Sequence, residues 1–185
     1  MKEINNFLPE DLAKQYYNFG LDVVTGKSGP NHIWTNQVWN KDIVRDSSIV
    51  ICIKLPDKFL QELQNILESQ MCFDPNTDEP LISSKSAMIY VWSKNSYIPV
   101  HADGMYSKAI TVYLNNSWEY NDGGMFNWFD EKLQEWKNIT PTFNKAVVND
   151  LGYLHGITPV KSSTNRITLQ VFINRINQNN VASTL

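Results

Sequence analysis

The sequence predicts a mainly β fold of the α+β class, an antiparallel barrel or jelly roll with N-terminal helices packed on one sheet. Up to about residue 85, apolar residues recur at helical spacing in two segments; beyond it, short strand-like segments alternate with turn residues. The 185 residues, 42% hydrophobic and 19% charged, suit one globular domain. We expect a support region over residues 1–85, a barrel core over residues 86–175 and a loose polar tail over residues 176–185.

Two helices are expected in the support region. The first spans residues 9–20, with Pro9 near its start and Gly20 as its stop. The second spans residues 57–70, where Asp57 can cap the N-terminal end. The apolar residues of the second helix form one stripe: Phe59, Leu60, Leu63, Ile66 and Leu67.

Short apolar or alternating segments bounded by turn residues predict the strands. They cover residues 32–39, 48–55, 87–92, 108–114, 124–129, 145–149, 152–160 and 166–174. In the last of these, Ile167, Leu169 and Val171 share one face, while Arg166 and Thr168 lie on the other. The mixed face either meets solvent or lines a barrel interior, with the apolar face packed under the helices.

Composition disfavours two classes of partner. Sixteen basic against nineteen acidic residues give a net charge of -3, without the basic excess of a nucleic-acid-binding protein. The chain lacks both a secretory signal pattern and the roughly 18 consecutive apolar residues of a membrane span. Cys52 and Cys72 lie in different settings and are expected to be unpaired. A cytoplasmic protein is therefore expected.

Two of the chain's three histidines lie in segments that fit a metal site. Asp103 follows His101 by two positions at the end of an expected strand, and His155 lies in another strand. Two imidazoles and one carboxylate that leave open coordination positions form the facial triad of iron(II) oxygenases. Taken alone, the doublet also fits a surface turn, since chance produces one with a frequency of roughly 0.3. His155 alone also fits a buried strand histidine.

A carboxylate-binding group follows the second histidine. Arg166, eleven residues after His155, offers a planar fork that suits the distal carboxylate of a dicarboxylic cosubstrate. Thr168 points the same way from the same strand, and Tyr113 offers a hydroxyl from a neighbouring strand. Taken alone, Arg166 also fits a solvated charge at the end of a strand. Thr168 and Tyr113 also fit ordinary structural residues of the barrel.

Together these segments resemble the catalytic domain of the prolyl 4-hydroxylase-like 2-oxoglutarate dioxygenases. The resemblance lies in YIPVHAD, in AITVYLNNSWEYNDGGMFNWF with its double glycine, in ITPTFNKAVVND, in HGITPV and in NRITLQVF. It implies a double-stranded β-helix with iron(II) on His101, Asp103 and His155, and with 2-oxoglutarate paired to Arg166. Dioxygen as cosubstrate and ascorbate as reductant follow from the same resemblance.

The resemblance also assigns two aromatic residues to the cosubstrate. Tyr113 matches a tyrosine that, in the oxygen-sensing branch, helps to bind the distal carboxylate. Trp92 lies nine residues before His101, where relatives commonly carry a tyrosine near the cosubstrate. A cosubstrate contact is therefore expected at Trp92, although the residue type departs from the family pattern.

The implied reaction is hydroxylation of a C–H bond with release of succinate and CO2. The expected substrate is a prolyl or similar residue in a protein or peptide, with a free amino acid or small metabolite as the alternative. A nucleobase is disfavoured, because the corresponding demethylases carry a second arginine where this chain has Phe172. An alternative from another functional class is a jelly-roll binding protein without catalytic activity. The intact triad and Arg166 argue against it. The sequence does not specify the oligomeric state.

Overall fold

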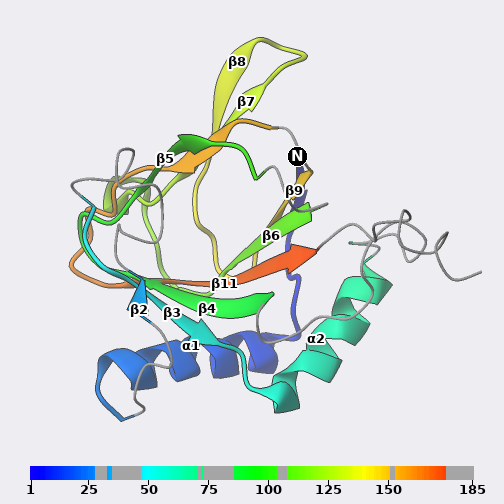
Figure 1. Ribbon diagram of the computed structural model, residues 1–185, viewed down its shortest axis with the longest axis vertical. Coiled ribbons are helices and arrows are strands. Elements are labelled where there is room, and N and C mark those ends of the chain that lie inside the picture. Colours follow the sequence, from blue (N-terminus) through cyan, green and yellow to red (C-terminus); the bar gives the residue numbers. More distant parts are fainter. Residues whose placement is uncertain are drawn as a thin grey trace, which may run out of the picture.

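The computed structural model describes residues 1–27, 33–34, 47–70, 72, 86–103, 108–150 and 153–173. Two antiparallel sheets face each other (Figure 1). The seven-stranded sheet contains, in spatial order, β1 (Lys2–Ile4), β9 (Ala146–Asp150), β6 (Lys108–Tyr113), β11 (Arg166–Ile173), β4 (Ala87–Trp92), β3 (Val50–Lys54) and β2 (Ile33–Trp34). The four-stranded sheet contains β5 (Ile98–His101), β10 (His155–Ile157), β7 (Phe126–Asp130) and β8 (Glu135–Ile139). The sheets do not close into a continuous barrel, and the predicted double-stranded β-helix is confirmed.

Helices α1 (Glu10–Val24) and α2 (Asp57–Ser69) cover the outer face of the seven-stranded sheet (Figure 1). The apolar stripe of α2 is confirmed, with Leu63 and Leu67 fully buried in the core. Asp57 is the first helical residue and makes no capping hydrogen bond, so its predicted role as a cap is wrong. Pro56 precedes the helix instead, and the Asp57 carboxylate lies where the partial positive charge of the helix N-terminus favours an anion.

Gly20 does not end the first helix, contrary to the prediction, because α1 continues to Val24. The reason for a glycine at this position is close packing on the sheet. A Cβ atom at Gly20 would lie 2.9 Å from Ile167 Cγ2 and 3.2 Å from Ile89 Cγ2. The missing side chain therefore lets the helix backbone lie directly on β11 and β4.

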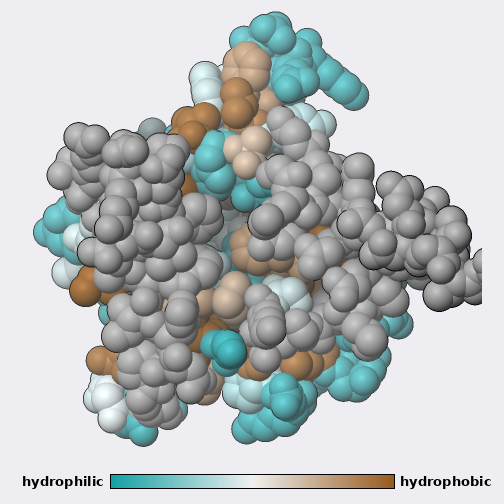
Figure 2. Space-filling model, viewed as in Figure 1, coloured by the Kyte–Doolittle hydropathy of each residue, from teal (hydrophilic) through white to brown (hydrophobic). Residues whose placement is uncertain are grey.

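The two faces of the central strand β11 meet different environments. Ile167, Leu169 and Val171 are fully buried in the core under the helices. Arg166 and Gln170, on the other face, line a cavity between the two sheets. The surface of the molecule is hollowed at the centre of this view (Figure 2). The alternation left open whether the mixed face of this strand meets solvent or lines the interior. The structure shows that it lines the interior.

Strand bounds agree with the prediction where alternation or an apolar run is strong, as in β4 and β11. The last residue predicted for β11, residue 174, lies outside the described part of the chain. The expected strand 152–160 is shorter: β10 ends at Ile157, and Val160 forms an isolated bridge to Gly123. β1 and β8 were not predicted, and β5 was expected only as a strand without stated bounds that ends near His101. β8 exposes Glu135, Trp136 and Asn138, so it has no apolar alternation to detect. Of residues 32–39 only 33–34 are described, and the tail 176–185 lies outside the described residues.

Cys52 and Cys72 are both free and buried, as expected. Neither described helix is long and apolar enough to cross a membrane.

Gly20→Val should lower the free energy of unfolding by about 1–3 kcal/mol, because the added methyl groups collide with Ile167 and Ile89. Urea unfolding measures the change. Asn18→Ala on the exposed side of α1 is the control and should shift stability by less than about 0.5 kcal/mol. Equal stability of Gly20→Val and the wild type would contradict the packing role of this glycine.

Candidate metal and cosubstrate site

The predicted metal ligands converge at the pairing of two short strands. His101 ends β5, His155 begins β10, and the two residues are direct antiparallel partners. Asp103 follows β5 by two residues, so the chain turns its carboxylate back toward both imidazoles. One potential ligand atom from each of the three residues lies within 4.8 Å of the others. A resident metal ion requires such a convergence of donors from separate elements.

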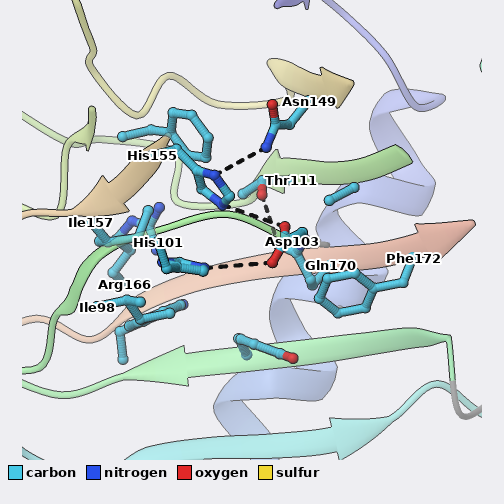
Figure 3. Close-up of a pocket in the computed structure, with 14 residues that line it drawn as sticks. Ile98, His101, Asp103, Thr111, Asn149, His155, Ile157, Arg166, Gln170 and Phe172 are labelled. Carbon is cyan, nitrogen blue, oxygen red and sulfur yellow. Dashed lines mark hydrogen bonds and ion pairs between the residues drawn. The ribbon is translucent and has the colours of Figure 1, made fainter. Parts of the chain in front are cut away.

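Both imidazoles present the same nitrogen to the carboxylate (Figure 3). His101 Nε2 lies 3.5 Å from Asp103 Oδ1, and His155 Nε2 lies 3.4 Å from Asp103 Oδ2. His155 is buried, while His101 and Asp103 are half-buried. Two nitrogen donors and one oxygen donor on one side of a cavity match the donor set of a facial triad with open positions.

The opposite ring nitrogens are held by the backbone. His101 Nδ1 lies 2.8 Å from the Pro99 carbonyl oxygen, and His155 Nδ1 lies 3.0 Å from the Tyr153 carbonyl oxygen. Because a carbonyl only accepts, this geometry assigns the hydrogen to Nδ1 in both rings. When the ring is protonated, Nε2 carries a hydrogen as well and donates it to Asp103. When the ring is neutral, the lone pair is on Nε2, toward Asp103. This is the tautomer that metal-binding histidines need.

The three ligands also favour an ionised carboxylate. Burial raises the pKa of Asp103, but the hydrogen bonds and charges of the two imidazoles outweigh it and hold that pKa well below its usual range. Burial lowers the pKa of His101, but the contacts with Asp103 and the Pro99 carbonyl outweigh it and raise that pKa. Asp103 is thus an anion at neutral pH, available to a cation.

Arg166 lies fully buried in the same cavity, with an exposed fraction of 1%. None of its three guanidinium nitrogens has a hydrogen-bond partner among the described residues, and neither does the hydroxyl of buried Tyr113. Burial lowers the pKa of Arg166 to about 10, so the group stays charged at neutral pH. A buried cation without a partner is costly. The structure therefore fits a carboxylate at this point, as 2-oxoglutarate provides.

The double glycine shapes the wall over this guanidinium. Gly123 and Gly124 have φ angles of 70° and 63°, in the left-handed region that favours glycine. A Cβ atom at Gly124 would lie 2.7 Å from Arg166 Cδ. The loop can therefore lie directly on the arginine side chain only because residue 124 has no side chain.

The remaining predicted residues lie around Arg166. The rings of Trp92 and Tyr113 lie 5.1 Å and 5.2 Å from Arg166 Cζ. Thr168 is fully buried and accepts a hydrogen bond from Trp92 Nε1 at 3.2 Å. All seven predicted site residues thus gather at one cavity and the buried layer beside it. His32, left without a role by the sequence, lies outside the described residues.

Sequence reasoning missed three polar residues of the cavity: Thr111, Asn149 and Gln170. The Asn149 side-chain amide lies 3.1 Å from His155 Nδ1, and Thr111 donates to Gln170 Oε1 at 2.7 Å. Their position on the mixed faces of predicted strands was visible in the alternation. Their contacts depend on strand pairing, which the alternation does not reveal.

Purified protein stripped with a chelator should bind one equivalent of Mn(II) or Co(II), and binding should raise the melting temperature. At a metal concentration of 100 Kd the expected stabilisation is about 2.7 kcal/mol. His155→Ala should lose both the binding and the shift, measured by calorimetry and thermal unfolding. Asp130→Ala, which removes an acid bonded to Lys137 in the β7–β8 hairpin, is the control and should keep them. Unchanged binding by His155→Ala would exclude this metal site.

Comparison with known proteins agrees with this geometry. Residues 87–174 match the sequence model of the 2OG-Fe(II) oxygenase superfamily. No curated protein sequence matches the chain.

Solved structures share the fold. A prolyl-4-hydroxylase of Pseudomonas putida is 16% identical, with 95% of this chain and 92% of that chain covered and a TM-score of 0.69. A prolyl hydroxylase of Trichoplax adhaerens, solved with a peptide of the hypoxia inducible factor oxygen degradation domain, is 15% identical, with coverages of 99% and 87% and a TM-score of 0.71. A prolyl 4-hydroxylase of Phytophthora capsici is 14% identical, with coverages of 98% and 64% and a TM-score of 0.63.

The family match covers His101, Asp103, His155 and Arg166, and the iron(II), 2-oxoglutarate and O2 that the family uses fit the donor set found here. The similarity to the 2OG-Fe(II) oxygenase superfamily thus covers the part of the chain that carries the candidate site, and the fold is shared with three prolyl hydroxylases.

Proposed function

We propose that the chain is an iron(II)- and 2-oxoglutarate-dependent dioxygenase that hydroxylates a C–H bond of a prolyl or similar residue in a protein or peptide. In this proposal His101, Asp103 and His155 hold the iron, and Arg166 binds the distal carboxylate of 2-oxoglutarate. Tyr113, Thr168 and Trp92 surround that carboxylate. The observation that carries the proposal is the fully buried, unpartnered guanidinium that lines the same cavity as the triad.

Bound iron(II), 2-oxoglutarate and O2 supply the oxidation, in which the substrate gains one oxygen atom and 2-oxoglutarate becomes succinate and CO2. The chain's own residues supply geometry. The neutral imidazoles offer Nε2, Asp103 offers its carboxylate, and the cavity walls limit the access of water. Arg166 fixes one end of the cosubstrate, so that its keto-acid end is directed to the triad.

The substrate end of the cavity has a different chemistry. Along β11, Gln170 and Phe172 follow Arg166 on the same strand face and lie beyond Asp103 in the close-up (Figure 3). An amide and an aromatic ring suit a peptide carbonyl and an apolar ring better than they suit a charged base. The Trichoplax relative was solved with a peptide, which supports a peptide substrate. A cytoplasmic location and the use of ascorbate remain predictions.

Anaerobic addition of iron(II) and then 2-oxoglutarate tests the cofactor assignment. The chain should develop the weak visible charge-transfer band of the iron chelate, and Arg166→Leu should require a much higher 2-oxoglutarate concentration for the same band. Prolyl peptide arrays and small-metabolite pools, scanned by mass spectrometry for the gain of one oxygen atom, then test the substrate class. Oxidation confined to the metabolite pool would overturn the peptide assignment.

Asp103→Ala and His155→Ala should each lower 2-oxoglutarate consumption by more than about 100-fold, since even residues that only orient a metal ligand contribute about 10- to 100-fold. Succinate formation under air measures the loss. Asp130→Ala should keep wild-type consumption. Full consumption by either ligand variant would show that the triad assignment is wrong.

Phe172→Ala should raise KM for the oxidised substrate by about tenfold, because about 1.4 kcal/mol of aromatic contact is removed from the substrate end. The Kd of 2-oxoglutarate should stay within about twofold, since Phe172 lies six residues from Arg166 along β11. Phe129→Ala in β7, outside the cavity lining, is the control. An equal loss of cosubstrate affinity and substrate affinity would contradict this division of the cavity.

A further inference from the structure

Trp92 occupies a central position in the carboxylate end of the cavity. It is the direct antiparallel partner of Arg166 across the β4–β11 pairing, and it is 3% exposed. Its neighbours Arg166, Tyr113 and Thr168 are each no more than 1% exposed. Every polar atom of this group is thus removed from water, so each hydrogen bond that it makes or lacks has a large energetic effect.

The only polar atom of the Trp92 side chain is already used. An indole has one N–H and no acceptor, and Trp92 Nε1 donates that hydrogen to Thr168 Oγ1 at 3.2 Å. The hydroxyl of Thr168 has one hydrogen and two lone pairs, and one lone pair now faces Trp92. Among the described residues this hydroxyl has no other partner, so its hydrogen remains available. Thr168 lies between Arg166 and Gln170 on the strand face that lines the cavity.

Two aromatic rings flank the guanidinium, and among the described residues no group makes a hydrogen bond of good geometry to it, although the nearby Tyr113 hydroxyl favours its charged form. β4 and β6 flank β11 on its two sides, and each contributes one aromatic ring, Trp92 or Tyr113, about equally distant from Arg166 Cζ at 5.1 Å and 5.2 Å. Gly124 lies against the aliphatic part of the same side chain. This arrangement fixes the cation while leaving all its N–H groups free for a ligand.

We propose that Trp92 is a positioning residue that holds the Arg166 guanidinium with its ring and the Thr168 hydroxyl with its N–H, and that it donates no hydrogen bond to 2-oxoglutarate. The donors to the distal carboxylate are then Arg166, Thr168 and Tyr113. The inference rests on the proposed function, since it assumes that 2-oxoglutarate binds at Arg166.

Cosubstrate affinity tests the inference without any turnover. The Kd of 2-oxoglutarate is measured anaerobically, from the visible band of the iron(II) protein and by calorimetry of the Co(II) protein. Trp92→Phe keeps a ring and removes the N–H, whereas Trp92→Leu removes both. Thr168→Val removes the hydroxyl, Thr168→Ser restores it, and the double variant Trp92→Phe with Thr168→Val completes the cycle.

The expected pattern is specific. Thr168→Val should weaken binding by at least about tenfold, as expected for a lost hydrogen bond to a charged group, and Thr168→Ser should restore it. Trp92→Phe should weaken binding by only about two- to fivefold, and should add almost nothing to Thr168→Val, because both changes act through one hydroxyl. Trp92→Leu should weaken binding by a further factor of about ten, since a desolvated cation–π contact is lost.

Three outcomes would overturn the inference. In the first, Trp92→Phe binds 2-oxoglutarate as weakly as Trp92→Leu, and in the second, the losses of affinity in Trp92→Phe and Thr168→Val add fully in the double variant. In the third, Thr168→Val keeps the wild-type affinity. The first two would make the indole a direct donor to the cosubstrate. Metal stoichiometry and thermal unfolding of each variant show that it is folded. Absence of 2-oxoglutarate binding by the wild-type metal-loaded protein is a separate result, which sinks the proposed function itself.

Discussion

The register of β11 between β4 and β6 is the constraint on which the rest of the structure depends. The side chains of a strand alternate between faces, so a slip of one residue would move Arg166 into the apolar core and Ile167 into the cavity. Two pairings and one packing contact oppose such a slip. The apolar face is buried under α1 at Gly20, and on the other face Arg166 pairs with Trp92 and Thr168 with Tyr113.

The four-stranded sheet adds two of the predicted metal ligands, His101 and His155, to this frame. β10 pairs with β5 on one side and with β7 on the other, which brings His155 opposite both His101 and Trp128. Since the imidazoles belong to different strands, their separation is set by sheet geometry and not by side-chain flexibility. The cavity between the sheets thus has the candidate metal ligands on one wall and the buried Arg166 guanidinium on the other.

The site retains features that oppose stability. A buried guanidinium without a counter-ion costs several kcal/mol, and a buried tyrosine hydroxyl without a partner adds to this. The cation–π contacts of Trp92 and Tyr113 offset part of that cost. A bound dicarboxylate would remove the rest, so cosubstrate binding and stability should be coupled.

The sequence by itself determined the mainly β core and the two helices, and it predicted the set of residues proposed to carry the chemistry. These follow from local rules: the period of two in β11, the period of 3.6 in α2, and the donor types at His101, Asp103 and His155. Tertiary structure decided what local rules do not contain. Gly20 lies within α1 because the helix must approach Ile167, β8 forms only as the partner of β7, and the Trp92 N–H bonds to Thr168 across 76 positions in sequence. Each depends on a contact between distant segments, and such contacts leave no periodic signal in the chain.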